Sequence, residues 1–179
     1  MRPPIELTLE ATSDSRVRQV HAYWDRVRRD RLMPSRSDID PLDLRSCLGW
    51  ICMIEVTHGS PIGFRYRLDG SKLVEITGFD LTGKTVEQIQ SDDYRQLANM
   101  VYGRVVSTKT PLFLGNMEDW LERGFYMESV TLPLSDDGEL VTGLMDVVCP
   151  AKTLMLAGAT GLSLFHSAER TASPKLSFV

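Results

Sequence analysis

The chain has 179 residues, of which 42% are hydrophobic and 25% are charged. These values are typical of a soluble globular protein with one domain. The formal net charge of -4 argues against a general nucleic-acid-binding protein, whose surface would be basic. The three cysteines, Cys47, Cys52 and Cys149, have no disulfide-scaffold spacing, which indicates buried thiols in a reducing compartment.

Neither end of the chain predicts membrane insertion. The N-terminus lacks the apolar segment of a signal peptide. The most apolar late stretch, residues 143–165, is interrupted by Asp146, Pro150 and Lys152, so it does not resemble a membrane span. We therefore expect a cytoplasmic protein.

The first element is an amphipathic helix. Residues 1–13 are expected to form an N-terminal arm, and residues 14–30 a helix that belongs to a domain over residues 14–150. Its apolar residues recur at spacings of three and four and share one face: Val17, Val20, Trp24 and Val27. This face could pack on the chain's own sheet, or it could form a dimer or partner seam like that of a short coiled coil.

Two strands follow, over residues 50–56 and 64–68, separated by a hairpin turn. A one-turn helix is predicted over residues 71–76, and Thr85 with Gln88 forms a capping box for another short helix. From Tyr94 to Val105 the apolar residues recur at helical spacing, which predicts the clearest amphipathic helix of the chain.

The remaining segments resemble strands, over residues 112–117, 125–134 and 140–149, with a compact turn at 135–138. Residues 151–179 form a C-terminal extension whose first part is ambiguous between strand and helix. The order of elements predicts an α+β fold: an antiparallel five-stranded sheet with helices on one face, plus the N-terminal amphipathic helix.

Several motifs resemble those of a known family. They are the Tyr23-Trp24 pair in the first helix, the DIDP link at residues 38–41, and the run FRYRLDGSKLVEITGFDLTGKTVEQI at residues 64–89. Together they resemble single-domain bacterial PAS-like proteins over roughly residues 22–150. The resemblance implies a PAS-like fold and a sensory or regulatory role in signal transduction. Such a domain would bind a small molecule or a signalling protein, such as a kinase or regulator, and no output domain is recognised in the chain.

In a PAS-like cup, the helices and the inner face of the sheet enclose a small ligand site. The candidate ligand-binding residues are Tyr66, Leu73, Ile76, Leu97, Val101, Tyr102 and Val105. The hydroxyls of Tyr66 and Tyr102 could orient a ligand. The alternative is that these residues form only a filled core, in which case the chain is a protein–protein interaction adaptor without a ligand.

The common cofactors and catalytic motifs find little support. The long helix contains no histidine for haem, and no cysteine lies in a flavin-binding motif. The histidines (His21, His58 and His166) are far apart, and the cysteine spacing does not fit zinc, so a metal site is not expected. The chain has no nucleophile-elbow motif. We expect no catalytic residues; an unrecognised enzyme would need several titratable groups with perturbed pKa in one pocket.

Overall fold

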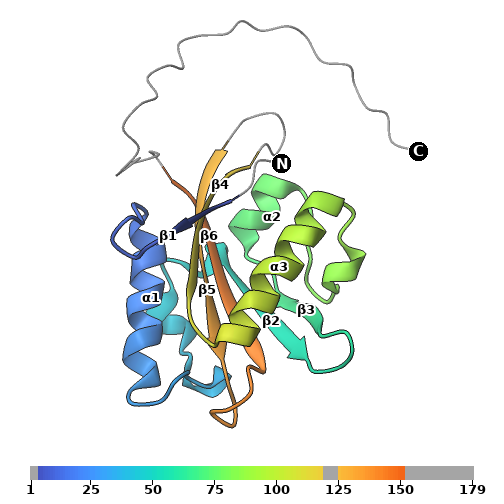
Figure 1. The fold of residues 1–179 in the computed structure, drawn as a ribbon. Coiled ribbons are helices and arrows are strands. Elements are labelled where there is room, and N and C mark those ends of the chain that lie inside the picture. The colour runs from blue at the N-terminus through green and yellow to red at the C-terminus, as the bar shows by residue number, and fades with distance from the viewer. Residues whose placement is uncertain (1–3, 119–124, 152–179) are drawn as a thin grey trace, which may run out of the picture.

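The computed structural model describes residues 4–118 and 125–151. Its centre is a six-stranded antiparallel sheet in the order β1-β4-β5-β6-β2-β3 (Figure 1). The strands are β1 (Ile5–Leu7), β2 (Ile51–Thr57), β3 (Gly63–Leu68), β4 (Leu112–Glu118), β5 (Phe125–Leu134) and β6 (Gly143–Pro150). The α+β class is confirmed, but the predicted number of five strands was wrong. The additional strand, β1, lies in the expected N-terminal arm and is too short to show a clear alternation of apolar residues.

Helices cover both faces of this sheet. The α-helices are α1 (Ser15–Arg28), α2 (Ser71–Thr77) and α3 (Asp92–Thr108). Four short 3-10 helices complete the described elements: η1 (Arg36–Asp38), η2 (Pro41–Leu44), η3 (Leu48–Trp50) and η4 (Val86–Gln88). Helix α1 packs on β5 and β6 from one side, while α3 lies across β5 on the opposite side (Figure 1). The sheet is therefore the middle layer of three.

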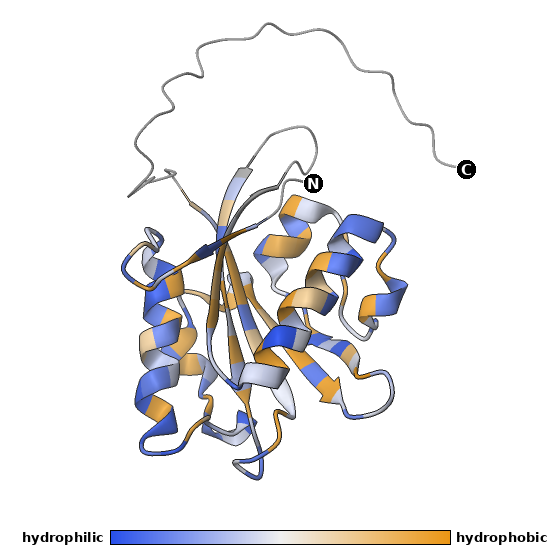
Figure 2. Cartoon of the chain, viewed as in Figure 1, coloured by the Kyte–Doolittle hydropathy of each residue, from blue (hydrophilic) through white to orange (hydrophobic). Residues whose placement is uncertain are grey.

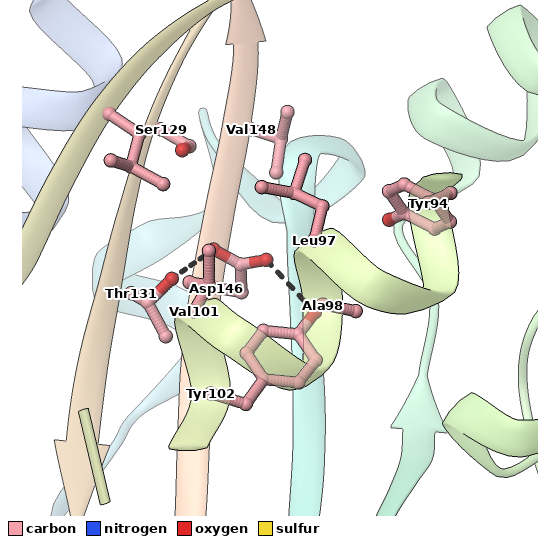
Figure 3. A pocket seen from close by; sticks show the side chains of 10 residues that line it. Tyr94, Leu97, Ala98, Val101, Tyr102, Ser129, Thr131, Asp146 and Val148 are labelled. Atoms are coloured by element: carbon pink, nitrogen blue, oxygen red, sulfur yellow. Dashed lines mark hydrogen bonds between the residues drawn. The ribbon is translucent and has the colours of Figure 1, made fainter. Parts of the chain in front are cut away.

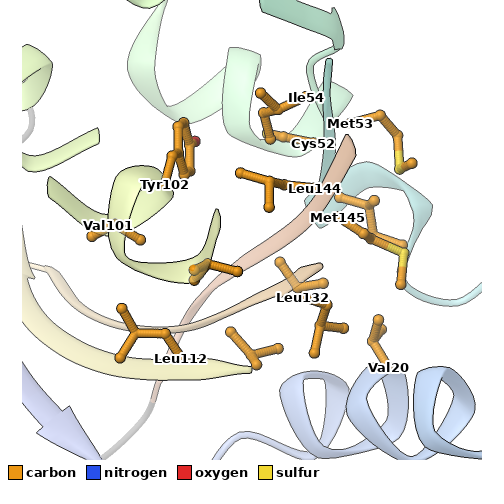
Figure 4. Close-up of a cluster of buried hydrophobic side chains, with 14 of the residues drawn as sticks. Val20, Cys52, Met53, Ile54, Val101, Tyr102, Leu112, Leu132, Leu144 and Met145 are labelled. Carbon is orange, nitrogen blue, oxygen red and sulfur yellow. The ribbon is translucent and has the colours of Figure 1, made fainter. Parts of the chain in front are cut away.

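The middle position explains why β2 does not alternate between buried and exposed residues. Its residues 51–54 are all buried, because the side chains on both faces of the strand belong to the core of the domain. Hydrophobic residues gather in the strands between the helices (Figure 2). Figure 4 shows Val20 of α1 on one side of Leu132 and Met145, with Val101 and Tyr102 of α3 on the other side.

The start of α1 is attached to the sheet through a buried carboxylate. Glu128 of β5 is only 2% exposed, and its Oε2 accepts hydrogen bonds from the backbone nitrogens of Ser13 (2.8 Å) and Asp14 (2.7 Å). Its Oε1 accepts from the Ser13 hydroxyl at 2.7 Å. Asp14 in turn caps the helix by accepting from the nitrogens of Arg16 and Val17. Burial alone would raise the pKa of Asp14, but these hydrogen bonds and the Arg16 charge hold it below its ordinary value.

The apolar face of α1 packs within the chain. Val17 and Val20 are fully buried and Trp24 is 3% exposed, while Val27 is partly buried against the same core. The indole nitrogen of Trp24 donates to the carbonyl oxygen of Pro133 at 2.8 Å. The structure thus has the first of the two arrangements considered for this helix. A second copy could use these four residues as a seam only if α1 left its own sheet.

The sequence also led to expectations about the cysteines, a membrane span and the C-terminal extension. The three cysteines are free thiols and are buried. Within residues 4–118 and 125–151, none of the helices has the length and apolar character needed to cross a membrane. Except for Ala151, the expected C-terminal extension lies outside the described residues.

Candidate functional site

A small cavity lies between α3 and the face of the sheet formed by β4, β5 and β6 (Figure 3). Its volume is about 50 Å³. The lining combines apolar side chains with a few polar groups: Tyr94, Leu97, Ala98, Val101, Tyr102, Leu114, Ser129, Thr131, Asp146 and Val148. Apolar walls with few, convergent polar groups are typical of ligand sites.

Helical and strand periodicity bring these residues to one place. Helix α3 begins at the Ser91 cap, whose hydroxyl accepts from the backbone nitrogen of Tyr94. Positions three and four apart then share the side of α3 that faces the sheet. On the sheet, Ser129 and Thr131 of β5 point to the same face because they are two residues apart, as do Asp146 and Val148 of β6.

Asp146 is the most unusual member of this lining. This residue is only 7% exposed, and the other residues at the centre of its strand are apolar. Oδ1 accepts a hydrogen bond from the Thr131 hydroxyl at 2.9 Å, and Oδ2 accepts from the Tyr102 hydroxyl at 3.2 Å (Figure 3). Among the described residues, no lysine, arginine or histidine forms an ion pair with it.

Burial dominates the protonation of this carboxyl. It raises the pKa of Asp146 from its ordinary 3.8 to about 6, against the two hydrogen bonds, which act to lower it. The nearby negative charge of Asp69 acts in the same direction as burial. The carboxyl therefore changes charge close to the pH of many cellular compartments, unlike an ordinary aspartate.

Tyrosine hydroxyls extend the polar cluster away from the cavity. The Tyr66 hydroxyl lies 2.9 Å from that of Tyr102, and Tyr94 also forms a hydrogen bond with Tyr66. Because Tyr102 donates to Asp146, Tyr66 is the donor in its bond to Tyr102. Burial raises the pKa of all three tyrosines, so they remain neutral donors.

A buried thiol completes this side of the sheet. The Cys52 sulfur donates to Asp69 Oδ1 at 3.1 Å, and the other oxygen of Asp69 accepts from the backbone nitrogen of Leu81. Burial raises the pKa of the Cys52 thiol well above its ordinary value. Cys52 is therefore a protonated, weakly reactive group and no nucleophile.

The structure separates the seven candidate ligand-binding residues into three groups. Leu97, Val101 and Tyr102 line the cavity. Tyr66 does not line the cavity but forms hydrogen bonds with two residues that do, Tyr102 and Tyr94. The other three do not line the cavity: Leu73 and Val105 are buried in the core, and Ile76 is partly buried.

Sequence reasoning predicted Tyr102 but missed the other polar members of the lining: Tyr94, Ser129, Thr131 and Asp146. The sequence does carry one signal for it. Asp146 is a lone charge inside the apolar run Gly143–Pro150, and a charged residue in a strand buried on both faces requires a partner or a function. Its three-dimensional partners, Thr131 and Tyr102, could not be read from that signal.

The chemistry that this arrangement supports is binding and proton storage. The cavity contains perturbed titratable groups, as the enzyme hypothesis requires. Its lining holds one carboxyl and several hydroxyls, and the described residues of the lining include no histidine or lysine that could act as a base for them. The described residues also contain no group of three or more histidine, cysteine, aspartate or glutamate side chains that could hold a metal ion.

The antiparallel sheet, the long helix across it and the small cavity between them define the class of protein as an α+β domain with a candidate ligand site. The sequence matches the PAS domain family over residues 12–146, which is most of the chain. The protein therefore belongs to the PAS domain family, as its motifs predicted, and this family is generally non-enzymatic. No curated protein matches the sequence significantly.

Proposed function

We propose that this chain is a cytoplasmic sensory domain that binds a small molecule in the cavity between α3 and the sheet. The observation that carries the proposal is the buried Asp146 carboxyl, which faces this cavity without a cationic partner among the described residues. Burying such a group lowers the stability of a domain, so a purely structural core would favour an apolar residue there. Ligand sites commonly keep such groups at the expense of stability.

Signal transmission would use the elements that the ligand contacts. A molecule in the cavity touches α3 on one side and β5 and β6 on the other, so its binding changes how firmly the helix is held on the sheet. We propose that a signalling protein, such as a kinase or regulator, recognises this difference. A homodimer is also proposed; since the apolar face of α1 is in the core, its interface would use other surfaces.

Native mass spectrometry of the purified protein, beside its denatured mass, tests the ligand. We expect an additional mass that is lost on denaturation. Leu97→Trp places a large side chain in the cavity and should abolish this mass. Met100→Trp is the matched control, because Met100 lies on the same helix but is 52% exposed. Retention of the mass by Leu97→Trp would exclude this cavity as its site.

A second candidate is an interaction adaptor without a ligand. The cavity volume favours it, because about 50 Å³ is far below the roughly 300–1,000 Å³ of pockets for drug-sized ligands. The adaptor predicts a bare polypeptide mass. It also predicts that Leu97→Trp, if folded, captures the same partner proteins as the wild type. The sensor predicts that this variant loses regulation of partner binding.

A further inference from the structure

The charges around the cavity indicate what kind of ligand it takes, if the proposed sensory function holds. Resting on that function, we propose that the site binds a small primary ammonium ligand, with the cationic group on Asp146 and a short alkyl chain on the apolar wall. The polar and apolar halves of the lining each contribute to this assignment.

The polar half offers acceptors to a cation. The two Asp146 oxygens each receive one hydrogen bond, from Thr131 and Tyr102, which leaves further lone pairs on both. The Thr131 hydroxyl hydrogen is directed at the carboxylate, so the Thr131 oxygen and that of Ser129 can accept from a donor, while the Tyr102 oxygen already accepts from Tyr66. An ammonium group has three donors and no acceptor, and therefore matches this set.

The surroundings disfavour an anion. The lining contains no arginine, lysine or histidine to neutralise a carboxylate or phosphate ligand. Asp69 lies near enough to Asp146 to influence its ionisation and adds negative charge to the same region. A cationic ligand supplies the opposite charge that Asp146 lacks among the described residues, and this contact is strong where water is largely excluded.

The apolar half limits the size of the ligand. Leu97, Val101 and Val148 stand beside the carboxyl in the lining (Figure 3). The volume of about 50 Å³ exceeds the roughly 10–15 Å³ that a single water molecule needs. It accommodates a few heavy atoms, so an ammonium group with a short alkyl chain fits and a large ring system does not.

Binding of such a ligand depends on pH through Asp146. Its titratable and charged neighbours are Tyr94 and Tyr102 from α3, Tyr66 from β3, Cys52 from β2, and Asp69. Burial raises the pKa of the tyrosines and of Cys52, so these groups stay neutral below pH 8. An alkylammonium ion also keeps its charge in this range. Protonation of Asp146 therefore weakens binding as the pH falls through about 6.

The test titrates the full chain with n-propylammonium, n-propanol and propionate, which share one alkyl chain. Binding is followed by NMR shifts of amides next to the cavity, at about pH 7.5 and about pH 5. We expect n-propylammonium to bind at least about tenfold more tightly than the other two at the higher pH, and to weaken at the lower pH. Equal or tighter binding of propanol or propionate would overturn the ammonium assignment.

Two variants keep the result interpretable. Asp146→Asn retains the shape of the side chain but not its charge, and should lose at least about tenfold in n-propylammonium affinity and its pH dependence. Glu139→Gln removes an exposed charge that is not part of the cavity lining and should bind as the wild type does. Unchanged affinity in Asp146→Asn would refute the role of its carboxylate. If only neutral or anionic compounds shift the resonances of the cavity residues, the ammonium assignment fails while the sensory function stands. If no compound in a panel of small fragments shifts these resonances, the ammonium assignment and the proposed sensory function both fail.

Discussion

The buried Asp146 carboxyl should make the stability of the folded protein depend on pH in a direction opposite to that of most aspartates. The pKa of Asp146 is about 6 in the folded protein and 3.8 at its ordinary value, which we take for the unfolded chain. Below the lower value the group is protonated in both states and burial has no electrostatic cost. Above about 6 it is ionised in both states, and the folded state must bury the charge.

The difference between these two values corresponds to ~3 kcal/mol of stability, which is present at low pH and lost as the pH rises through about 6. Asp146→Asn removes the ionisation while leaving a side chain of the same shape between Thr131 and Tyr102. The free energy of unfolding of the variant relative to the wild type should therefore rise by ~2.5 kcal/mol between about pH 4 and about pH 7.5, because the unfolded chain is already partly ionised at pH 4.

Urea unfolding measured by tryptophan fluorescence at both pH values gives this difference, provided that the denaturant slope is the same for both proteins. The comparison cancels the contributions of other carboxyls, which titrate equally in both chains. Glu139→Gln, at an exposed position, should show no such change with pH. A variant-minus-wild-type difference that stays flat or falls with pH would mean that burial does not control this carboxyl.

Three further predictions concern the packing. Glu128→Ala should lower the free energy of unfolding by about 3 kcal/mol in a urea titration, because three donors at the start of α1 lose a charged acceptor; a loss below about 1 kcal/mol would contradict this. Gly70→Ala should lower the melting temperature, because the added Cβ would lie 2.5 Å from the carbonyl oxygen of Gly49. Gly103→Ala, whose Cβ would meet open space within α3, should instead stabilise the protein by roughly 0.5–1 kcal/mol. A Gly70→Ala variant that is more stable than Gly103→Ala would refute the close approach of Gly70 to Gly49. Val20→Asp should abolish the cooperative thermal transition in circular dichroism, because it buries an unpaired charge; a folded monomer would instead support the dimer seam.

Local patterns predicted much of the secondary structure. Strand β5 has the predicted bounds, and the capping box of Thr85 and Gln88 is present. Both features depend on neighbours within a few residues, so the sequence contains their determinants. The strand predicted from residue 140 begins instead at Gly143, and the backbone nitrogens of Glu139 and Leu140 donate to the Asp137 side chain in the turn between β5 and β6.

The family and the α+β class were also available from the sequence, through motifs and the order of elements. The spacing of the apolar residues in α3 correctly placed Leu97, Val101 and Tyr102 on one helical face. Their role in binding stays a prediction. Periodicity reports that a face is buried, but it does not report whether a cavity remains beneath it.

Only the tertiary structure decided what lies opposite each buried face. The apolar stripe of α1 fits a sheet or a second helix equally well by sequence, and the structure places it on β5 and β6. The polar site depends on contacts between β3, α3, β5 and β6, which bring Asp146 within hydrogen-bonding distance of Thr131 and Tyr102. Hydrophobic spacing determines that a segment is helix or strand, whereas the pairing of distant segments depends on the packing of the whole domain.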